Sequence, residues 1–509
     1  MSVIKQEDLI QSVADAFQFI SYYHPLDFIQ ALGEAHDAEQ SPAAKDAIAQ
    51  ILLNSRMCAE GHRPICQDTG IAVVFLEVGM NVQWDAQLSV DEMINEGVRR
   101  AFTYPDNILR ASVLDDPAGQ RRNTRDNTPA VIHTRLVPGD ELSVKLAAKG
   151  GGSENKARFA MLNPSAYLVD WIVKTVAGMG AGWCPPGILG VGIGGTPEKA
   201  MLLAKESLLE PVNFHQLQEK VTREGKPQTR LEELRLELHE KINATGVGAQ
   251  GLGGVTTVLD VKILDYPTHA ASLPVALIPN CAATRHTHFT LDGSGAAEFT
   301  PPALKDWPAV TWKASPQARR VNLDSVTKAD IQSWKPGEQL LLSGKLLTGR
   351  DAAHRRIAET LAKCETLPDG VDFTNRFVYY VGPVDPVQGE TVGPAGPTTS
   401  SRMDKYTETM LANTGLIGMV GKAERGADAI ESIKKHQAVY LIAVGGAAYL
   451  ISKAIAKSRI VAYPELGMEA IYEFEVKEMP VTVAVDVHGS SVHQSGPEKW
   501  SRIIRKETS

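Results

Sequence analysis

The sequence is poor in cysteine and has no long hydrophobic run, and each shortage excludes a class of protein. It has five cysteines, an odd number scattered along 509 residues, which does not fit a disulfide framework. The most apolar stretch, residues 438–451, contains two glycines and is shorter than the roughly 20 residues that cross a bilayer. We therefore expect a reducing, cytoplasmic setting and no membrane role.

An excess of positive charge is also absent. The formal net charge is −8 at pH 7, which argues against a nucleic-acid partner, although a few buried Arg and Lys residues can still bind a small anion. The first residues include Glu7, Asp8 and Asp15 and lack the basic start and apolar core of a secretory signal. We expect an amphipathic helix there.

Hydrophobic periodicity predicts helices first and a mixture of helices and strands afterwards. Apolar residues recur at helical spacing within the first sixty residues, and residues 71–78 form a β-branched run typical of a buried strand. Glycine clusters at 150–152, 184–195 and 246–254 indicate tight turns or close approach to a ligand. No internal repeat is present, which excludes solenoids and propellers.

The length predicts at least two domains, because it exceeds what one hydrophobic core usually supports. Between about residues 290 and 335, scattered prolines and aromatic residues interrupt the hydrophobic periodicity that predicts helices and strands on either side. We expect an N-terminal domain over residues 1–288, a linker over 289–336 and a smaller α/β domain over 337–509. Within the last we expect strands at 339–347, 378–381, 439–444 and 481–487, and helices at 351–363 and 427–436.

Three cysteines lie in loops whose backbone is restrained by neighbouring proline or glycine. Cys66 follows Pro64, Cys184 precedes two prolines, and Cys281 follows Pro279 by two positions. These loops are far apart in sequence, which excludes a zinc knuckle or a ferredoxin-like CxxC cluster, whereas three converging thiolates suit an iron-sulfur cluster. Three thiolates on a four-iron cluster would leave one iron free to act as a Lewis acid.

The alternative is that these cysteines are small buried hydrophobic residues, as free cysteines often are. Cys58, inside a helical pattern, and Cys364, at the end of another, fit that description. His286 and His288 alternate along an expected strand, and we interpret them as a strand face rather than as metal ligands.

Six strings together resemble the class I, iron-sulfur-dependent fumarate hydratases. They occur in the family's order and cover nearly the whole chain: RPICQDTG (63–70), AKGGGSENK (148–156), GWCPPGILGVGIGGT (182–196), GAQGLGG (248–254), GPTTSSRMDKY (396–406) and ELGMEA (465–470). The resemblance implies an α/β fold with two domains: a mixed α/β N-terminal domain that binds the cluster and a smaller swivelling β/α C-terminal domain, usually in a homodimer. It also implies reversible hydration of fumarate to L-malate, a step of the tricarboxylic acid cycle.

The resemblance implies roles for individual residues. Cys66, Cys184 and Cys281 match the ligands of a 4Fe-4S cluster. Catalytic roles are implied for Thr398, Asp68 and His269, with Thr398 matching a proposed proton-transfer residue. The substrate-binding set is Gln67, Asp68, Arg110, Gly152, Arg350, Thr398, Arg402 and Lys422.

These residue types suit the reaction. Fumarate and malate are dicarboxylates, and the guanidinium of Arg pairs with a carboxylate through two hydrogen bonds. Removing a proton beside a carboxylate creates further negative charge, which the additional cations would stabilise. A Thr hydroxyl is a weak base, so Thr398 would need Asp68 or Lys422 nearby, and His269 is the alternative base.

Two points leave the substrate and the class of function open. The Asn123–Pro129 segment resembles the tartrate dehydratase branch, so L-tartrate and mesaconate/citramalate are alternative substrates, although tartrate dehydratases are typically split into separate subunits. A non-catalytic iron- or oxygen-sensing iron-sulfur protein and a structural-zinc enzyme are alternatives of other classes.

Overall fold

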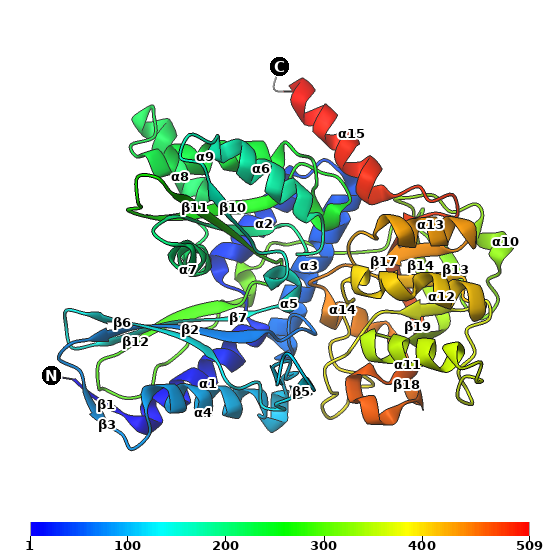
Figure 1. The fold of residues 1–509 in the computed structure, drawn as a ribbon, viewed down its shortest axis with the longest axis horizontal. Helices are drawn as coiled ribbons and strands as arrows, with labels where there is room; N and C mark the ends of the chain where they lie inside the picture. The colour runs from blue at the N-terminus through cyan, green and yellow to red at the C-terminus, as the bar shows by residue number, and fades with distance from the viewer. Residues whose placement is uncertain (1, 508–509) are drawn as a thin grey trace.

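The computed structural model describes residues 2–507, which form two units lying side by side (Figure 1). The helices expected in the first sixty residues are confirmed, because Leu9, Val13 and Phe17 are buried along one face of the first helix. The helices of the N-terminal unit are α1 (Gln6–Tyr22), α2 (Leu26–Ala38), α3 (Pro42–Gly61), α4 (Val90–Phe102), α5 (Gly151–Glu154), α6 (Leu168–Met179), α7 (Pro197–Ser207), α8 (Phe214–Glu224) and α9 (Arg230–Asn243). Single 3-10 turns are η1 (Pro105–Asn107), η2 (Ala249–Gly251) and η3 (Leu304–Asp306).

Two four-stranded sheets form the rest of this unit. The first has the order β12-β7-β2-β6 and consists of β12 (His286–Leu291), β7 (Leu142–Lys149), β2 (Ile71–Gly79) and β6 (Val131–Val137). The second has the order β10-β9-β11-β8 and consists of β10 (Val258–Tyr266), β9 (Gly187–Gly194), β11 (Leu273–Asn280) and β8 (Arg158–Leu162). Two short pairs complete it: β1 (Val3–Lys5) with β3 (Gln83–Asp85), and β4 (Leu114–Asp115) with β5 (Arg122–Asn123). The strand expected at 71–78 is therefore confirmed as β2.

The C-terminal unit is built on a seven-stranded sheet whose β14 and β19 also pair with each other, so that five of its strands close into a ring. Its strands are β13 (Arg319–Asn322), β14 (Gln339–Thr348), β15 (Phe377–Tyr379), β16 (Gly418–Gly421), β17 (Val439–Ile442), β18 (Ile455–Ala462) and β19 (Ile471–Val485). Its helices are α10 (Lys328–Ile331), α11 (Asp351–Ala362), α12 (Asp404–Asn413), α13 (Ala427–Lys435), α14 (Ala448–Lys453) and α15 (Val492–Glu507), with 3-10 turns η4 (Ser400–Met403) and η5 (Pro464–Glu469). The expected mixed α/β fold with two domains is confirmed.

The segment expected to be a linker, residues 289–336, contains regular structure at both ends. β12 continues to Leu291, and β13 pairs in parallel with β14 through Val321 and Leu342. The irregular part, residues 292–318, contains only the turn η3. The polypeptide therefore joins the seven-stranded sheet of the C-terminal unit, through β13, before the end of the expected linker.

The two units share buried contacts. One continuous apolar cluster joins Ile51 and Ile278 of the first unit to Tyr379 of the second. The last helix, α15, then returns to the first unit, where the Trp500 indole lies against the glycine-rich 246–254 segment. Figure 1 shows α15, in red, extending over the N-terminal unit. Within residues 2–507 no helix is long and apolar enough to cross a membrane.

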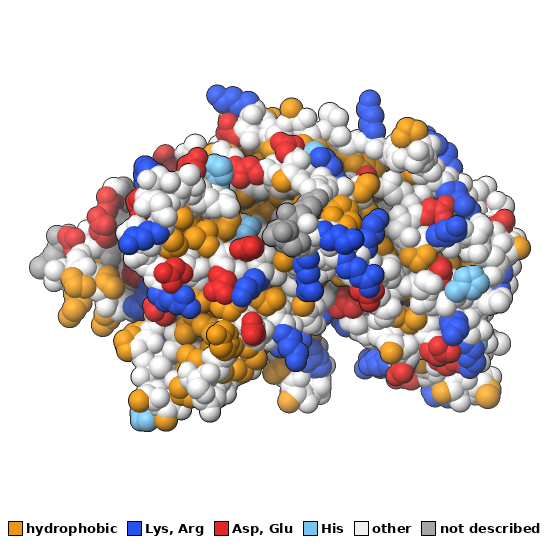
Figure 2. Space-filling view, turned by 90° about the horizontal axis from the view of Figure 1, so that it is seen from above, with side chains coloured by type: hydrophobic (Ala, Val, Ile, Leu, Met, Phe, Trp, Pro, Cys, Tyr) orange, Lys and Arg blue, Asp and Glu red, His pale blue; other side chains and the backbone are white. Residues whose placement is uncertain are grey.

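Charged side chains of both signs cover the surface. In the view from above, Lys and Arg side chains gather near the centre of the face, and acidic and basic side chains are interspersed over the rest (Figure 2). The net charge of −8 is therefore not concentrated in one acidic region of this face.

Candidate active site

The three loop cysteines meet because of how the strands pair. β9 and β11 are antiparallel, with Ile188 opposite Asn280, so the start of β9 and the end of β11 lie at the same edge of the sheet. Cys184 precedes β9, and Cys281 follows β11. The Ala282 amide donates to the Cys184 carbonyl at 3.1 Å, which holds these two loops together.

Cys66 reaches the same edge through the other sheet. It precedes β2, whose first residue pairs with Lys149 at the end of β7. The Lys149 ammonium donates to the Pro279 carbonyl at 2.8 Å and to Asn280 Oδ1 at 3.1 Å, beside Cys281. Burial lowers the pKa of Lys149 to about 8. This buried lysine therefore joins the two sheets where the cysteines lie.

The C-terminal unit contributes a cation and a close backbone approach at Cys184. Lys422 Nζ donates to Cys184 Sγ at 3.0 Å. Burial would lower the pKa of Lys422, but the neighbouring thiols of Cys184, Cys66 and Cys281 raise it, so the amine stays protonated near neutral pH. A Cβ atom at Gly445 would lie 2.5 Å from Cys184 Sγ, so only glycine allows this approach.

The three thiols form one group, because a charge interaction links each of them to at least one other. Across residues 2–507, no three His, Cys, Asp or Glu side chains are close enough together to hold one metal ion. A 4Fe-4S cluster differs because each thiolate binds a separate iron, which requires wider spacing between the sulfurs. Burial raises the pKa of Cys66 and raises that of Cys184 to about 11, so cationic or metal partners are needed to keep these thiolates charged.

Asp68 lies beside these thiols as an ionised carboxylate. Its Oδ2 accepts from the Gly151 amide at 2.8 Å, and its Oδ1 lies 3.7 Å from Arg110 Nη2. Burial would raise the pKa of Asp68, but Arg110, Arg285 and the Gly151 amide outweigh it and lower the pKa. The sequence analysis did not single out Arg285, a buried cation whose charge also acts on Cys66.

Two guanidinium groups, one from each unit, lie close together without full hydrogen bonding. Arg110 Nη1 donates to the Gly382 carbonyl at 2.6 Å, and Arg350 lies against the same Gly382. The Nε atoms of both Arg110 and Arg350 are buried without a hydrogen-bond partner among residues 2–507. Burial and the charge of Arg350 lower the pKa of Arg110 to about 10. Arg350 also lies 3.5 Å from Glu469, as Arg110 lies 3.7 Å from Asp68, so the feature that could attract a further anion is the pair of unused Nε donors.

The remaining predicted residues near the thiols are Gln67, Thr398 and Gly152. Gln67 Nε2 donates to the Pro397 carbonyl at 3.1 Å, next to buried Thr398. The Lys422 amide donates to the Thr398 carbonyl at 3.2 Å. Thr398 therefore lies directly beside the backbone of the lysine that contacts Cys184. A Cβ at Gly152 would lie 3.6 Å from Lys422 Nζ, so this glycine borders the same space.

Arg402 lies at the edge of this group. It pairs with Asp351 through two hydrogen bonds, and its side chain is 42% exposed, in contrast to 9% for Arg350. Asp351 is the first residue of α11 and directly follows Arg350, so Arg402 lies beside the anion site with its donors already paired.

The structure does not bring His269 to this group, contrary to the sequence-based expectation. His269 is exposed in the turn before β11, and its Nδ1 accepts from the Ala271 amide at 3.1 Å. Cys281 follows the other end of that eight-residue strand, roughly 26 Å away at about 3.3 Å per residue. Within one chain His269 is therefore separated from the thiols by the full length of β11.

Gln250 is a second residue that the sequence analysis did not single out. Its Nε2 donates to the Pro185 and Gly445 carbonyls, and its Oε1 accepts from the Gly445 amide at 2.8 Å. It therefore holds the loop of Cys184 to the segment of the C-terminal unit that covers it. The signal available in the sequence was its place in the glycine-rich GAQGLGG string.

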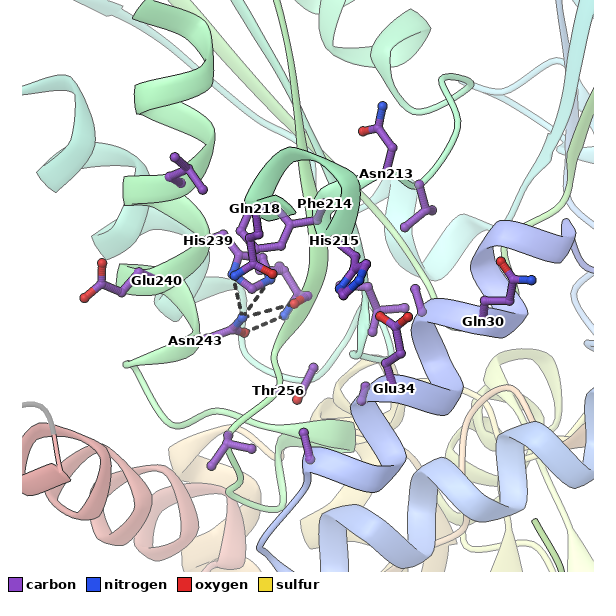
Figure 3. A pocket seen from close by; sticks show the side chains of 18 of the residues that line it. Gln30, Glu34, Asn213, Phe214, His215, Gln218, His239, Glu240, Asn243 and Thr256 are labelled. Carbon is purple, nitrogen blue, oxygen red and sulfur yellow. Dashed lines mark hydrogen bonds between the residues drawn. The ribbon is translucent and has the colours of Figure 1, made fainter. Parts of the chain in front are cut away.

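A separate hollow of about 790 Å³ lies between α2, α8 and α9 (Figure 3). The figure shows Glu34 on α2 facing His215, and Asn243 bonded to the His239 ring on the other side of the hollow. No Lys or Arg lines it, so it does not suit a dicarboxylate. The thiol-lined site between the units is the better candidate for such a ligand.

The fold and this site define a two-domain α/β protein with three thiols and buried cations where its two units meet. Comparison with known families matches residues 10–290 to the fumarate hydratase (Fumerase) family and residues 293–496 to the fumarase C-terminus family. The chain is 31% identical to the anaerobic class I fumarate hydratase of Escherichia coli K12, covering 96% of this chain and 90% of that one.

A second fumarate hydratase covers a similar length of the chain, and a tartrate dehydratase subunit covers about half of it. Identity to the aerobic class I fumarate hydratase of Escherichia coli K12 is 33%, covering 90% of this chain and 84% of the relative. A putative L(+)-tartrate dehydratase subunit alpha of Methanocaldococcus jannaschii is 34% identical over 54% of this chain and 94% of its own length. The chain belongs to the class I fumarate hydratase family, and it is a hydro-lyase.

Proposed function

We propose that the protein catalyses the reversible hydration of fumarate to L-malate, with a 4Fe-4S cluster held by Cys66, Cys184 and Cys281. One observation carries the proposal: the charge of Cys66, one of three loop thiols that act on one another, also acts on Arg110, and Arg110 and Arg350 come from opposite units with a buried Nε each that has no hydrogen-bond partner within residues 2–507. Names of relatives that cover most of the chain support fumarate as substrate.

A dicarboxylate resolves the electrostatic conflict in the site. Arg110 and Arg350 each have a buried Nε without a partner, and each repels the other. A carboxylate between them would accept from both and neutralise the repulsion, because charge-assisted hydrogen bonds to guanidinium are among the strongest in proteins. The second carboxylate would then point toward the thiols and Lys422.

The chemistry divides between the cluster and the chain. When bound, the cluster would supply a Lewis-acid iron that attracts the hydroxyl and carboxylate oxygens of the substrate. Lys422 stays cationic beside Cys184 and would stabilise negative charge that develops on the substrate. Thr398 is the proposed proton-transfer residue, and Asp68, held ionised by Arg110, is the adjacent carboxylate that would accept the proton.

Two residues stand outside this arrangement. Arg402 would contact the substrate only after leaving Asp351, and His269 has no part in the site of its own chain. A homodimer and a cytoplasmic setting are also part of the proposal, and sedimentation of the purified protein tests the first of these.

The decisive test is Cys184→Ser, prepared without air and compared with Cys58→Ser. Cys58 is a matched control because it is fully buried in α3 and its Sγ donates to the Pro64 carbonyl. We expect Cys184→Ser to lose both the brown chromophore and fumarate turnover, and Cys58→Ser to keep both. Full turnover by a colourless, zinc-loaded protein would contradict the cluster, and a brown protein without turnover would favour the sensor alternative.

A second candidate substrate is L-tartrate. It is favoured by the match to a putative L(+)-tartrate dehydratase subunit alpha over 54% of the chain. Anaerobic steady-state assays on fumarate, L-malate, L-tartrate and mesaconate decide the order of preference. A higher kcat/KM for L-tartrate than for L-malate would replace fumarate hydration as the proposed function.

A further inference from the structure

An open hollow of about 530 Å³ lies directly outside Arg110, between the two units. We call it the mouth. The N-terminal unit contributes the turn after α4 and the residues around β5, and the C-terminal unit contributes two loop segments. It is lined by Phe102, Thr103, Ile108, Leu109, Arg110, Ala111, Asn123, Arg125, Pro383, Asp385, Gly467 and Met468.

The inner end of the mouth reaches Arg110 and is separated from Arg350 by Met468. Arg110 lines it directly, with its side chain 9% exposed and its Nε unpaired. Met468 also lines it, and its Sδ lies 3.8 Å from Arg350 Nη1. A dianion that enters here would meet Arg110 first and Arg350 next.

The outer end carries an unpaired cation, Arg125. Its side chain has no ion pair or hydrogen bond within residues 2–507, although its amide donates to Asn123 Oδ1 at 2.7 Å. The two nearby arginines are engaged elsewhere, since Arg121 donates to the Pro117 carbonyl and Arg122 pairs with Asp115. Arg125 is therefore available to an incoming anion.

A carboxylate lies at the opposite side of the mouth. Asp385 is exposed and lines the same hollow, and its main-chain carbonyl accepts from Arg63 Nη2 at 3.0 Å. The charged residues that line the mouth are thus two cations, Arg110 and Arg125, and one anion, Asp385. Their net charge is positive, which favours the approach of a dianion. Clefts with charge of one sign increase the local concentration and the association rate of an oppositely charged ligand.

We propose that the mouth is the path by which a small dicarboxylate reaches the site, with Arg125 as its outer recognition residue and Asp385 as an opposing charge. This inference rests on the proposed function for the identity of the ligand. Arg125 acts before the chemical step, so its charge should affect capture of the substrate and leave the rate of the saturated enzyme unchanged.

The test compares four variants with the wild-type holoenzyme under anaerobic conditions: Arg125→Gln, Arg125→Lys, Asp385→Asn and the control Arg122→Gln. Arg122→Gln removes the same charge from the same hairpin but does not line the mouth. For Arg125→Gln we expect kcat/KM for fumarate to fall about threefold to tenfold at low ionic strength, with kcat unchanged. For Asp385→Asn we expect kcat/KM to rise, and for Arg125→Lys to stay near wild type.

Salt distinguishes steering from a structural defect. The differences among variants should shrink toward unity at about 0.5 M salt, because screening shortens the Debye length to a few ångströms. The affinity of succinate, a saturated dicarboxylate, measured by calorimetry at two salt concentrations, gives a second readout independent of turnover.

The outcomes separate the two proposals. If the wild type hydrates fumarate but Arg125→Gln matches Arg122→Gln in kcat/KM and in succinate affinity, the mouth inference is overturned and the proposed function stands. If the wild type fails to hydrate fumarate, the proposed function fails, and the succinate affinities of the variants still decide the role of Arg125. Should Arg125→Gln not fold, an Asp385→Asn variant without increased capture overturns the inference.

Discussion

The residues that define this site are cations placed where their charges conflict. Arg110 and Arg350 are both buried, lie against the same Gly382 backbone, and keep one donor each unused. Each guanidinium has a carboxylate neighbour, Asp68 at 3.7 Å from Arg110 and Glu469 at 3.5 Å from Arg350, but neither occupies the buried Nε donors, which remain open to an anion. In the proposed function, the unused donors of this pair are the physical basis of affinity for a dicarboxylate.

Arg350→Gln should therefore lower kcat/KM for fumarate by about 100-fold, since truncating one partner of a buried charge pair costs about 2–5 kcal/mol. Arg356→Gln is the control, because Arg356 lies on α11 close to Arg350 but is 44% exposed and pairs with Glu465. Steady-state kinetics on both variants provide the measurement. Equal kcat/KM values for the two variants would remove Arg350 from the site.

Among the structural elements, the segment 382–397 joins the two units above the site. It belongs to the C-terminal unit, but its carbonyls accept from Arg110 and Gln67 of the first unit. Arg63, 2% exposed, pairs with Glu390 of the segment and donates to the Asp385 carbonyl. A glycine- and proline-rich segment without regular structure is thus held by a buried ion pair in addition to the packing of Val392 and Ala395 in the main apolar cluster.

Glu390→Ala should destabilise the protein by about 3 kcal/mol, because it leaves the buried Arg63 charge without its partner. Glu478→Ala is the control, since its pair with Arg320 is largely exposed and such pairs contribute less than about 1 kcal/mol. Thermal unfolding of the anaerobic proteins measures the difference. A similar Tm for both variants would show that the segment does not depend on this ion pair.

At the scale of the whole molecule, the two units are not independent. One apolar cluster runs from α2 and α3 into the closed sheet of the C-terminal unit, and α15 returns to the first unit. His493 Nε2 of α15 also lies 3.2 Å from the Gln250 carbonyl oxygen. Gln250 in turn donates to the Pro185 carbonyl in the loop of Cys184. We expect both units to unfold in one cooperative transition.

Trp500→Ala tests this coupling. The Trp500 side chain is 9% exposed and packs on Gly253, so its removal should destabilise the protein by about 3 kcal/mol and lower the single transition as a whole. Lys499→Ala, at the exposed neighbouring position, should leave Tm unchanged. Two separate calorimetric transitions in Trp500→Ala, with only one shifted, would contradict a common cooperative unit.

Much of this architecture could be predicted from the sequence. The periodicity of α1, the apolar run of β2 and the strands β14, β17 and β19 were predicted within a few residues, except that β19 begins earlier than expected. These elements are local: their burial depends on side-chain spacing along one helix or strand. The start of β13 inside the expected linker was missed, because a four-residue edge strand has too few residues to show a period.

The sequence by itself singled out the residues to which we assign the chemistry, since the three loop cysteines and the Arg and Lys residues of the matched strings are chemically distinctive. Only the tertiary structure decided which of them meet. Antiparallel pairing of β9 and β11 brings Cys184 to Cys281, whereas the same strand separates His269 from both. Proximity between distant loops depends on strand direction and domain contact, and neither is encoded in the local pattern of residues around each loop.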